Sequence, residues 1–129
     1  MSAFDVVVLG AGPGGYVAAL RAAQLGAAVC MVEKDVVGGT CLNRGCIPSK
    51  ALIHSAALWK RAQEGTAFGV TASNWAFDWA AAQTRKNQIV SAQVKGVHML
   101  LGAAKVAVKQ GVGSLLDPRT VKIAANGSD

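Results

Sequence analysis

The feature that most constrains this chain is a glycine-rich turn directly after a short apolar segment. Residues 6–9, Val-Val-Val-Leu, form a β-branched run that predicts a strand buried on both faces, as in a parallel sheet. The next six residues fit the pattern G-x-G-x-x-G, and residues 13–25 then show helical spacing that stops at Gly26. A second apolar run over 28–32 completes a strand–helix–strand unit. This order predicts an α/β fold with a parallel sheet.

Each glycine of this turn has a separate steric task. Gly10 permits the tight turn, Gly12 lets the backbone approach a pyrophosphate, and Gly15 lets helix and strand pack closely. The start of the helix also offers free N–H groups and a positive dipole end to phosphates. The residues of the turn that we predict to bind a dinucleotide are Gly10, Gly12, Pro13, Gly14 and Gly15.

The end of the second strand carries the expected partner of the nucleotide sugar. Glu33 stands there, where a carboxylate can accept hydrogen bonds from a ribose hydroxyl. Lys34 would suit the 2′-phosphate of NADP by charge, but the neighbouring carboxylate would repel that phosphate, so we place Lys34 in an adenosine site. The motif alone does not separate FAD from NAD. The alternative is that the glycines only form a turn and that Glu33 is a solvated strand end.

A pair of cysteines five positions apart carries the second chemical signal. Cys41 and Cys46 lie in the stretch GGTCLNRGCIPSK, residues 38–50, whereas Cys30 lies within the second strand. Positions i and i+5 of a regular helix point roughly 140° apart, so a disulfide between them requires a departure from ideal helix. Gly45 supplies that freedom. A disulfide that closes so small a loop stabilises little, which favours a redox role over a structural one.

Other roles for the cysteines fit less well. A metal site would favour C-x-x-C spacing, and only His54 and His98 remain as further ligands, so we predict no metal. Unreactive burial would explain a cysteine within a strand, but not the pair in a glycine-rich setting. The nearby helix N-terminus should lower the pKa of at least one thiol, and Lys50, one turn after Cys46, should favour a thiolate.

The rest of the chain predicts two longer helices and three short strands. We expect helices at about 42–64 and 79–101, with Asp78 as the N-cap of the second and a loop at 65–77 between them. The strands are expected at 105–109, about 112–116 and 120–124, with a turn at 117–119.

Composition limits the partners and the compartment. The chain has a formal charge of +6, but its thirteen Lys and Arg residues are scattered, so we expect no nucleic-acid binding. No apolar run reaches the roughly 18 residues of a membrane span, so no membrane association is expected. The N-terminus resembles neither a signal nor a transit peptide, which predicts a cytoplasmic protein of bacterial type.

Together these motifs resemble one known family. GAGPGGY at 10–16, VEK at 32–34 and GGTCLNRGCIPSK at 38–50 are similar to the pyridine nucleotide–disulfide oxidoreductases, and within them to the dihydrolipoamide dehydrogenases. Mercuric reductases share much of the pattern, whereas glutathione and trypanothione reductases typically carry Lys where this chain has Ser49. Arg44, where the family commonly has Val, is a departure that adds a positive charge beside the cysteines.

The resemblance implies a flavin-linked redox function. Cys41 would be the interchange thiol that meets the substrate, and Cys46 the thiolate that contacts the flavin ring. A substrate dithiol would reduce the Cys41–Cys46 disulfide, and its electrons would pass to FAD and then as hydride to NAD⁺. The further residues that the resemblance places around FAD are Glu33 and Lys34 at the adenosine, Gly38, Gly39, Thr40, Cys41 and Lys50 towards the flavin, and Gly113 on the adenine side.

The resemblance also implies a larger protein. Residues 1–129 would be the N-terminal part of a FAD-binding domain, with helices on one side of its sheet and a small β-meander on the other. The remainder of that domain, an NAD domain and a dimerisation domain with the general base would lie outside this chain. The implied partners are dihydrolipoamide or the lipoyl domain of a 2-oxoacid dehydrogenase or glycine-cleavage complex, and a second copy in a homodimer. The alternatives are another disulfide reductase, such as mercuric reductase, or a truncated, non-catalytic nucleotide-binding fragment.

Overall fold

Three parallel strands form the central sheet in the order β1-β2-β3. The computed structural model describes residues 3–124, and its strands here are β1 (Val6–Leu9), β2 (Val29–Glu33) and β3 (Ala107–Gln110). The parallel register of β1 on β2 begins at Val6 opposite Val29, and that of β2 on β3 begins at Cys30 opposite Ala107. The prediction of an α/β fold with a parallel sheet is therefore confirmed.

The two apolar runs lie in different environments. All five residues of β2 are buried, because this strand has a neighbour on each side and is also covered on both faces of the sheet. Val6, Val7 and Leu9 of β1 are 37–45% exposed. The prediction that residues 6–9 are buried on both faces is wrong, because β1 is an edge strand within the described part of the chain.

Helices cover one face of the sheet and a β-hairpin lies on the other. Helices α1 (Pro13–Gln24) and α4 (Trp79–Ala103) pack on the first face, where Met31 of β2, Ala19 of α1 and Leu101 of α4 share one fully buried cluster. The hairpin consists of β4 (Val112–Asp117) and β5 (Thr120–Ala124). A Cβ built on Gly113 of β4 would lie 2.6 Å from the side chain of Leu9, which shows how closely the hairpin approaches the sheet.

The predicted strand at 105–109 and the two after it divide between two sheets. After α4 the chain reverses at Lys105, whose φ is +57°, and β3 then extends the parallel sheet. Gly111, at a φ of +143°, turns the chain into β4 and donates its N–H to the Glu33 carbonyl at 2.8 Å. Only the last two strands therefore form the small antiparallel layer, with a turn at 118–119.

The predicted helix at 42–64 is broken in two. It consists of α2 (Gly39–Asn43) and α3 (Cys46–Gln63), and the 3-10 helix η1 (Glu64–Phe68) follows at the start of the predicted loop. The helix predicted at 79–101 is confirmed as α4, and its N-cap is Asp78, whose Oδ1 accepts the Ala81 N–H at 2.9 Å.

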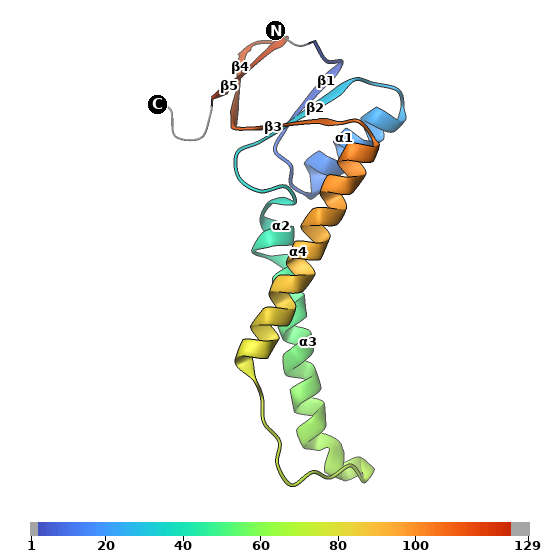
Figure 1. Ribbon diagram of the computed structural model, residues 1–129, viewed down its shortest axis with the longest axis vertical. Coiled ribbons are helices and arrows are strands. Elements are labelled where there is room, and N and C mark those ends of the chain that lie inside the picture. The colour runs from blue at the N-terminus through green and yellow to red at the C-terminus, as the bar shows by residue number, and fades with distance from the viewer. Residues whose placement is uncertain (1–2, 125–129) are drawn as a thin grey trace.

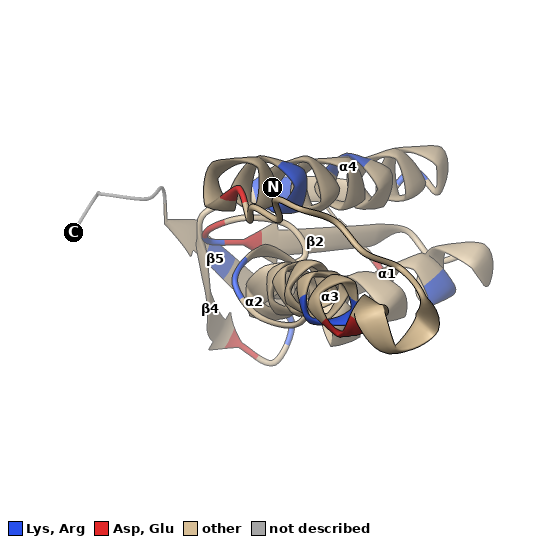
Figure 2. Ribbon diagram, turned by 90° about the horizontal axis from the view of Figure 1, so that it is seen from below, with Lys and Arg blue, Asp and Glu red and all other residues tan. Residues whose placement is uncertain are grey.

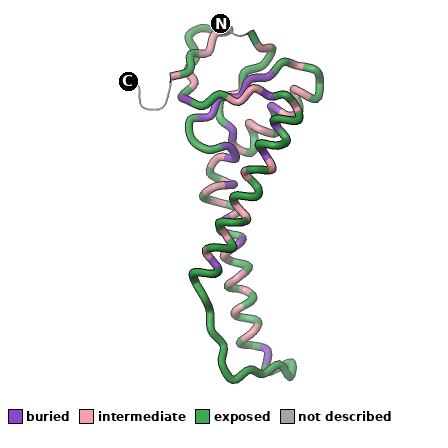
Figure 3. Tube along the Cα trace, in the orientation of Figure 1, coloured by how far each residue is buried: buried purple, intermediate pink, exposed green. Residues whose placement is uncertain are grey.

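Helices α3 and α4 run side by side away from the sheet (Figure 1). We call residues 51–95 the arm and the remaining described residues the head. Buried positions gather in the head, whereas the far half of the arm is largely exposed (Figure 3). Lys and Arg residues are spread over several elements and do not form one continuous run (Figure 2). Among the residues described, no helix combines the length and apolar character needed to cross a membrane.

Candidate dinucleotide and redox site

The glycine turn at residues 10–15, the phosphate turn, has the steric features that its sequence predicts. Gly10 has a φ of +94°, in the left-handed region that favours glycine, and its N–H donates to the Val32 carbonyl at 2.7 Å. A Cβ on Gly15 would overlap the carbonyl oxygen of Gly10. A Cβ on Gly12 would meet no atom within 4 Å, so the space that a side chain would occupy there is open. A ligand can therefore approach the main chain at Gly12.

The N-terminus of α1 faces the same space. Gly12 is its N-cap and provides no side chain to bond the first amides, while Pro13 occupies the first helical turn. The amides of Gly14 and Gly15 have no acceptor within the helix because they lie in its first turn. Amides at a helix N-terminus, together with the helix dipole, form a suitable site for the phosphates of a dinucleotide.

Glu33 connects this turn to the end of β2. The residue is only 7% exposed, and its carboxylate accepts the N–H of Ala11 at 2.6 Å and the N–H of Asp35 at 2.8 Å. A carboxylate has further lone pairs, so it can accept a ribose hydroxyl in addition. Lys34 follows directly and is exposed. Gly113 lies in β4 against Leu9 and Val32, on the hairpin side of the sheet.

The redox segment, residues 38–50, packs directly on the phosphate turn. Gly38 donates its N–H to the carbonyl of Ala11 at 2.7 Å, and a Cβ on Gly39 would lie 2.7 Å from the Cα of Gly12. Both glycines have positive φ, at +102° and +60°. The exposed Thr40 follows on α2. The structure thus brings the two motifs, which are separate in the sequence, into backbone contact.

The break between α2 and α3 brings the two cysteines together. Cys41 lies in α2, Cys46 is the first residue of α3, and Gly45 between them has a non-helical φ of −119° and ψ of −104°. Both are free thiols, Cys41 half-buried and Cys46 exposed, and they lie close enough for Cys46 to affect the thiol of Cys41. The departure from ideal helix that a contact between positions i and i+5 requires is thus concentrated at this break.

The electrostatic effect on Cys41 differs from expectation. Its side-chain hydrogen bond to Cys46 raises the pKa of the Cys41 thiol above the ordinary 9.0, and partial burial adds to the rise. The backbone N–H of Cys46 and the charge of Lys50 act in the opposite direction but are weaker. The pKa of Cys41 is therefore raised and not lowered, because the neighbouring thiol outweighs the cation and the helix amide. The predicted lowering of at least one thiol pKa is thus not met at Cys41. Cys30 is buried in β2, and burial raises the pKa of its thiol.

Two polar residues of the redox segment have roles that the sequence did not reveal. Asn43 donates from Nδ2 to the carbonyls of Val37 at 3.1 Å and Gly39 at 2.9 Å. Arg44 forms an ion pair with Asp35, at 2.6 Å between Nη2 and Oδ2. The only signal in the sequence is that both are polar residues between two cysteines, which does not identify their partners.

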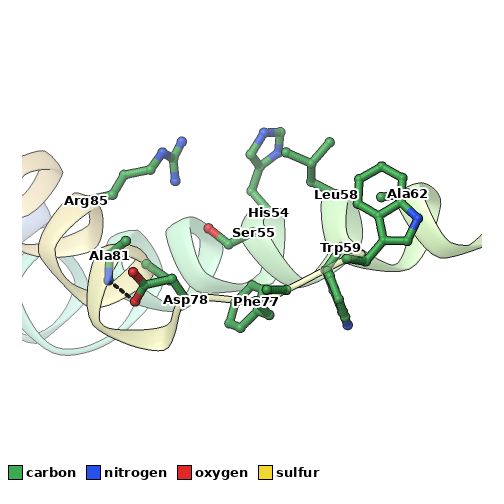
Figure 4. Close-up of a pocket in the computed structure, with 12 residues that line it drawn as sticks. His54, Ser55, Leu58, Trp59, Ala62, Phe77, Asp78, Ala81 and Arg85 are labelled. Atoms are coloured by element: carbon green, nitrogen blue, oxygen red, sulfur yellow. Dashed lines mark hydrogen bonds between the residues drawn. The ribbon is translucent and has the colours of Figure 1, made fainter. Parts of the chain in front are cut away.

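The histidines lie away from this arrangement. His54 is exposed on α3, eight positions after Cys46, which is about 12 Å along a helix axis. It borders a largely apolar groove of about 430 Å³ between α3 and the start of α4 (Figure 4). His98 is exposed on α4. Within residues 3–124, no group of three or more His, Cys, Asp or Glu side chains could hold a metal ion.

The residues of the head fit a flavin dinucleotide better than a nicotinamide dinucleotide. A phosphate-binding helix start and a ribose-binding carboxylate are common to both cofactors. A thiol pair that packs on the phosphate turn is useful only beside a group that can take electrons from thiols, and the isoalloxazine ring is such a group. The site can therefore combine dinucleotide binding with dithiol–disulfide chemistry.

The comparisons with known proteins agree with this site. The family described as pyridine nucleotide-disulphide oxidoreductase matches residues 4–128. The chain belongs to this family. The resemblance drawn from its motifs is thus confirmed, and the family implies binding of FAD.

Curated relatives narrow the resemblance within the family. The chain is 47% identical over 115 residues to a dihydrolipoyl dehydrogenase of Bacillus subtilis. The aligned region covers 89% of this chain and 24% of the relative. It is 46% identical over 127 residues to the dihydrolipoyl dehydrogenase of Chlorobaculum parvum, which covers 98% of this chain and 27% of the relative. The dihydrolipoyl dehydrogenase of Chlamydia muridarum is 46% identical over 121 residues. The chain thus spans about a quarter of the length of these relatives.

Proposed function

We propose that this chain supplies FAD binding and the redox-active dithiol of an enzyme that oxidises dihydrolipoamide to lipoamide with NAD⁺ as acceptor. The observation that carries the proposal is the contact between the redox segment and the phosphate turn, where Gly39 lies against Gly12. This contact supports a single site in which a bound dinucleotide reaches the thiols. The similarity to dihydrolipoyl dehydrogenases supports the choice of substrate.

The residues of the head would bind the cofactor in an extended form. The amides of Gly14 and Gly15 would bind its pyrophosphate, and the carboxylate of Glu33 would accept from its ribose. Gly38, Gly39, Thr40 and Lys50 would line the flavin end, with Lys34 and Gly113 on the adenosine side. When bound, FAD would accept an electron pair from the reduced thiols and deliver hydride to NAD⁺.

The thiol chemistry would proceed by exchange at Cys41. One thiolate of the substrate attacks the Cys41 sulfur, and the disulfide bond to Cys46 breaks with the electron pair remaining on Cys46. The second substrate thiolate attacks the substrate sulfur of this mixed disulfide, which releases Cys41 and forms the cyclic disulfide of the product. The raised pKa of Cys41 favours its thiol form, in which the S–H can donate a hydrogen bond to the Cys46 thiolate while the proton stays on Cys41.

The complete protein would contain further parts. We propose that residues 1–129 form the first part of the FAD domain, followed by an NAD domain and a dimerisation domain that supplies the general base. The complete protein would act as a cytoplasmic homodimer and would receive its substrate from the lipoyl domain of a 2-oxoacid dehydrogenase or glycine-cleavage complex. The isolated chain should therefore have no dehydrogenase activity.

An anaerobic titration of the natural full-length protein with dihydrolipoamide tests the proposal. Reduction should produce a long-wavelength absorption band from a thiolate beside the flavin. The Cys46→Ser variant should lack this band, whereas Cys41→Ser should show it before any substrate is added. Absence of flavin, or turnover with Hg(II) but not with dihydrolipoamide, would contradict the proposal. NAD⁺-dependent turnover by the 129-residue chain alone would contradict its last part.

A further inference from the structure

Arg44 lies between the two cysteines and its side chain is directed to a different part of the fold. The residue is the C-cap of α2, and its backbone N–H donates to the Thr40 carbonyl at 2.9 Å. Its guanidinium Nη2 lies 2.6 Å from Oδ2 of Asp35, two residues after Glu33. A hydrogen bond therefore holds the backbone of Arg44, and the ion pair holds its side chain. Both contacts lie at the break between α2 and α3.

The partner of Arg44 is itself fixed by hydrogen bonds to two strand ends. The backbone N–H of Asp35 donates to Glu33 Oε1 at 2.8 Å, and its carbonyl accepts from Gln110 Nε2, at the end of β3, at 2.8 Å. Asp35 is thus tied to the ends of two neighbouring strands before it meets the guanidinium. Because the backbone of Asp35 is already held and its side chain is short, most of the side-chain ordering that the ion pair requires falls on Arg44.

The pair has little value as a stabilising contact. The side chains of Arg44 and Asp35 are 64% and 46% exposed, and exposed ion pairs contribute little to the free energy of unfolding. Its position suggests a geometric role instead. The loop that it holds must keep two thiols at a separation that a continuous helix does not permit. Gly45, the next residue, would otherwise leave that loop free to change conformation.

Charge does not account for the placement of Arg44. The cation whose field acts on the Cys41 thiol is Lys50, one turn into α3. The guanidinium of Arg44 is neutralised by Asp35 instead. An arginine whose role was to lower a thiol pKa would face the sulfur, so the contact with Asp35 indicates a role in holding the loop.

We propose that the Asp35–Arg44 ion pair is a latch that holds the Cys41–Cys46 loop in the geometry that forms the disulfide. Arg44 is then a positioning residue, and the inference rests on the proposed redox function of the two cysteines. Opening the latch lowers the effective concentration of one thiol at the other. The disulfide therefore becomes easier to reduce, while the thiols keep their chemistry.

A double-mutant cycle on the full-length flavoprotein tests the latch. The variants are Arg44→Val, Asp35→Asn and both together, each equilibrated anaerobically in mixtures of reduced and oxidised dithiothreitol. Acid quenching, alkylation and peptide mass then give the ratio of dithiol to disulfide at Cys41 and Cys46. The matched control is Lys60→Ala, which removes an exposed ion pair with Glu64, at 3.6 Å, from the arm.

We expect each single variant to shift the equilibrium about two- to fivefold towards the dithiol, the range that an exposed ion pair allows. The double variant should shift no further than either single one, because both open the same latch. The control variant should have the same ratio of dithiol to disulfide as the wild type. Flavin content and the thermal unfolding midpoint should be unchanged in all variants.

Three outcomes would overturn the latch. Unchanged equilibria in the single variants would show that the pair does not position the loop. Shifts in opposite directions would indicate a charge effect, since one variant removes a positive charge and the other a negative one. Additive shifts in the double variant would show independent roles. A wild-type protein that forms no disulfide in any mixture would instead refute the proposed function, and the latch with it.

Discussion

The head and the arm of this molecule are built in different ways. In the head, Ala11, Met31 and Leu101 have no exposed surface, and Glu33 is 7% exposed with both carboxylate oxygens bonded to backbone amides. In the arm, Leu58 is 62% and Phe68 85% exposed. The head therefore fixes positions through close packing and short-range hydrogen bonds, whereas the arm is a pair of helices that contact each other and leave much of their apolar surface exposed.

The residues of the candidate site are divided between the two regions in the same way. The phosphate turn, the Glu33 carboxylate and the cysteine pair all lie in the head. The arm has aromatic contacts instead, with the rings of Trp59 and Phe77 at 5.9 Å between centroids and those of Phe77 and Trp79 at 6.4 Å. One side-chain hydrogen bond joins the two helices of the arm, in which Arg85 Nη1 donates to the Ala51 carbonyl at 3.3 Å. Equivalent substitutions should therefore have larger effects in the head than in the arm.

The largest difference is expected from one substitution made in both regions. Leu101→Ala in the head should lower the free energy of unfolding by about 2–5 kcal/mol, because it leaves a cavity beside Met31. Leu58→Ala in the arm should change it by less than about 0.5 kcal/mol. Denaturant unfolding of the full-length protein measures both values. Equal losses would show that the arm is as tightly packed as the head.

A pair of glycine substitutions tests the phosphate turn. Gly15→Ala should cost about 1–3 kcal/mol, because the new Cβ would overlap the Gly10 carbonyl oxygen. The control Gly102→Ala, in α4, meets no atom within 4 Å and should stabilise by up to about 1 kcal/mol through helix propensity. Thermal unfolding and flavin content report the two effects. A Gly15→Ala protein with normal stability would contradict the close approach at this turn.

The N-cap of the arm should have an intermediate effect. Asp78→Ala removes the acceptor of the Ala81 N–H and should cost about 1 kcal/mol. Asp78→Asn keeps a side-chain oxygen and should retain most of the stability. Circular dichroism during thermal unfolding measures the change. A loss as large for Asn as for Ala would show that charge at the helix start, rather than the hydrogen bond, is what stabilises α4.

The features that could be predicted from the sequence depend on neighbouring residues. The glycine geometry of the phosphate turn and the N-cap at Asp78 follow from local steric and hydrogen-bonding rules, and both agree with the structure. The exposure of β1 could not be predicted in this way, because an apolar strand has the same sequence whether or not further strands flank it. The placement of β3 beside β2 depends on a reversal at Lys105 that no glycine or proline marks.

The candidate site was predictable in its residue types but not in its connections. The cysteine spacing predicts a departure from ideal helix, but it does not predict that the segment from 42 to 64 divides into two separate helices. The contacts of Asn43 with Val37 and of Arg44 with Asp35 depend on how the redox segment folds back on the end of β2. Spacing along the chain does not contain that information.

The smallest effect concerns a single proton in the redox segment. In the reduced protein the pKa of Cys41 lies above the ordinary 9.0, mainly because its thiol is hydrogen-bonded to Cys46. A raised pKa in the folded state favours the protonated thiol, so this contribution to stability is present below pH 9 and is lost as pH rises through the folded pKa. The alkylation rate of Cys41 should therefore reach half its alkaline limit above pH 9.

Removing the neighbouring thiol should shift this titration in the opposite direction. In Cys46→Ala the main cause of the rise is absent, whereas the lowering effect of Lys50 remains, so the pH of half-maximal alkylation should fall towards that of an unperturbed cysteine. Rates of iodoacetamide labelling at Cys41, followed by peptide mass between pH 7 and 11, measure the shift in the two proteins. Cys30→Ala is the matched control, because this buried thiol is in β2 and should leave the titration unchanged. A midpoint that stays fixed in Cys46→Ala would show that burial, and not the partner thiol, raises the pKa of Cys41. Packing in the head would then be what sets the protonation of the redox pair.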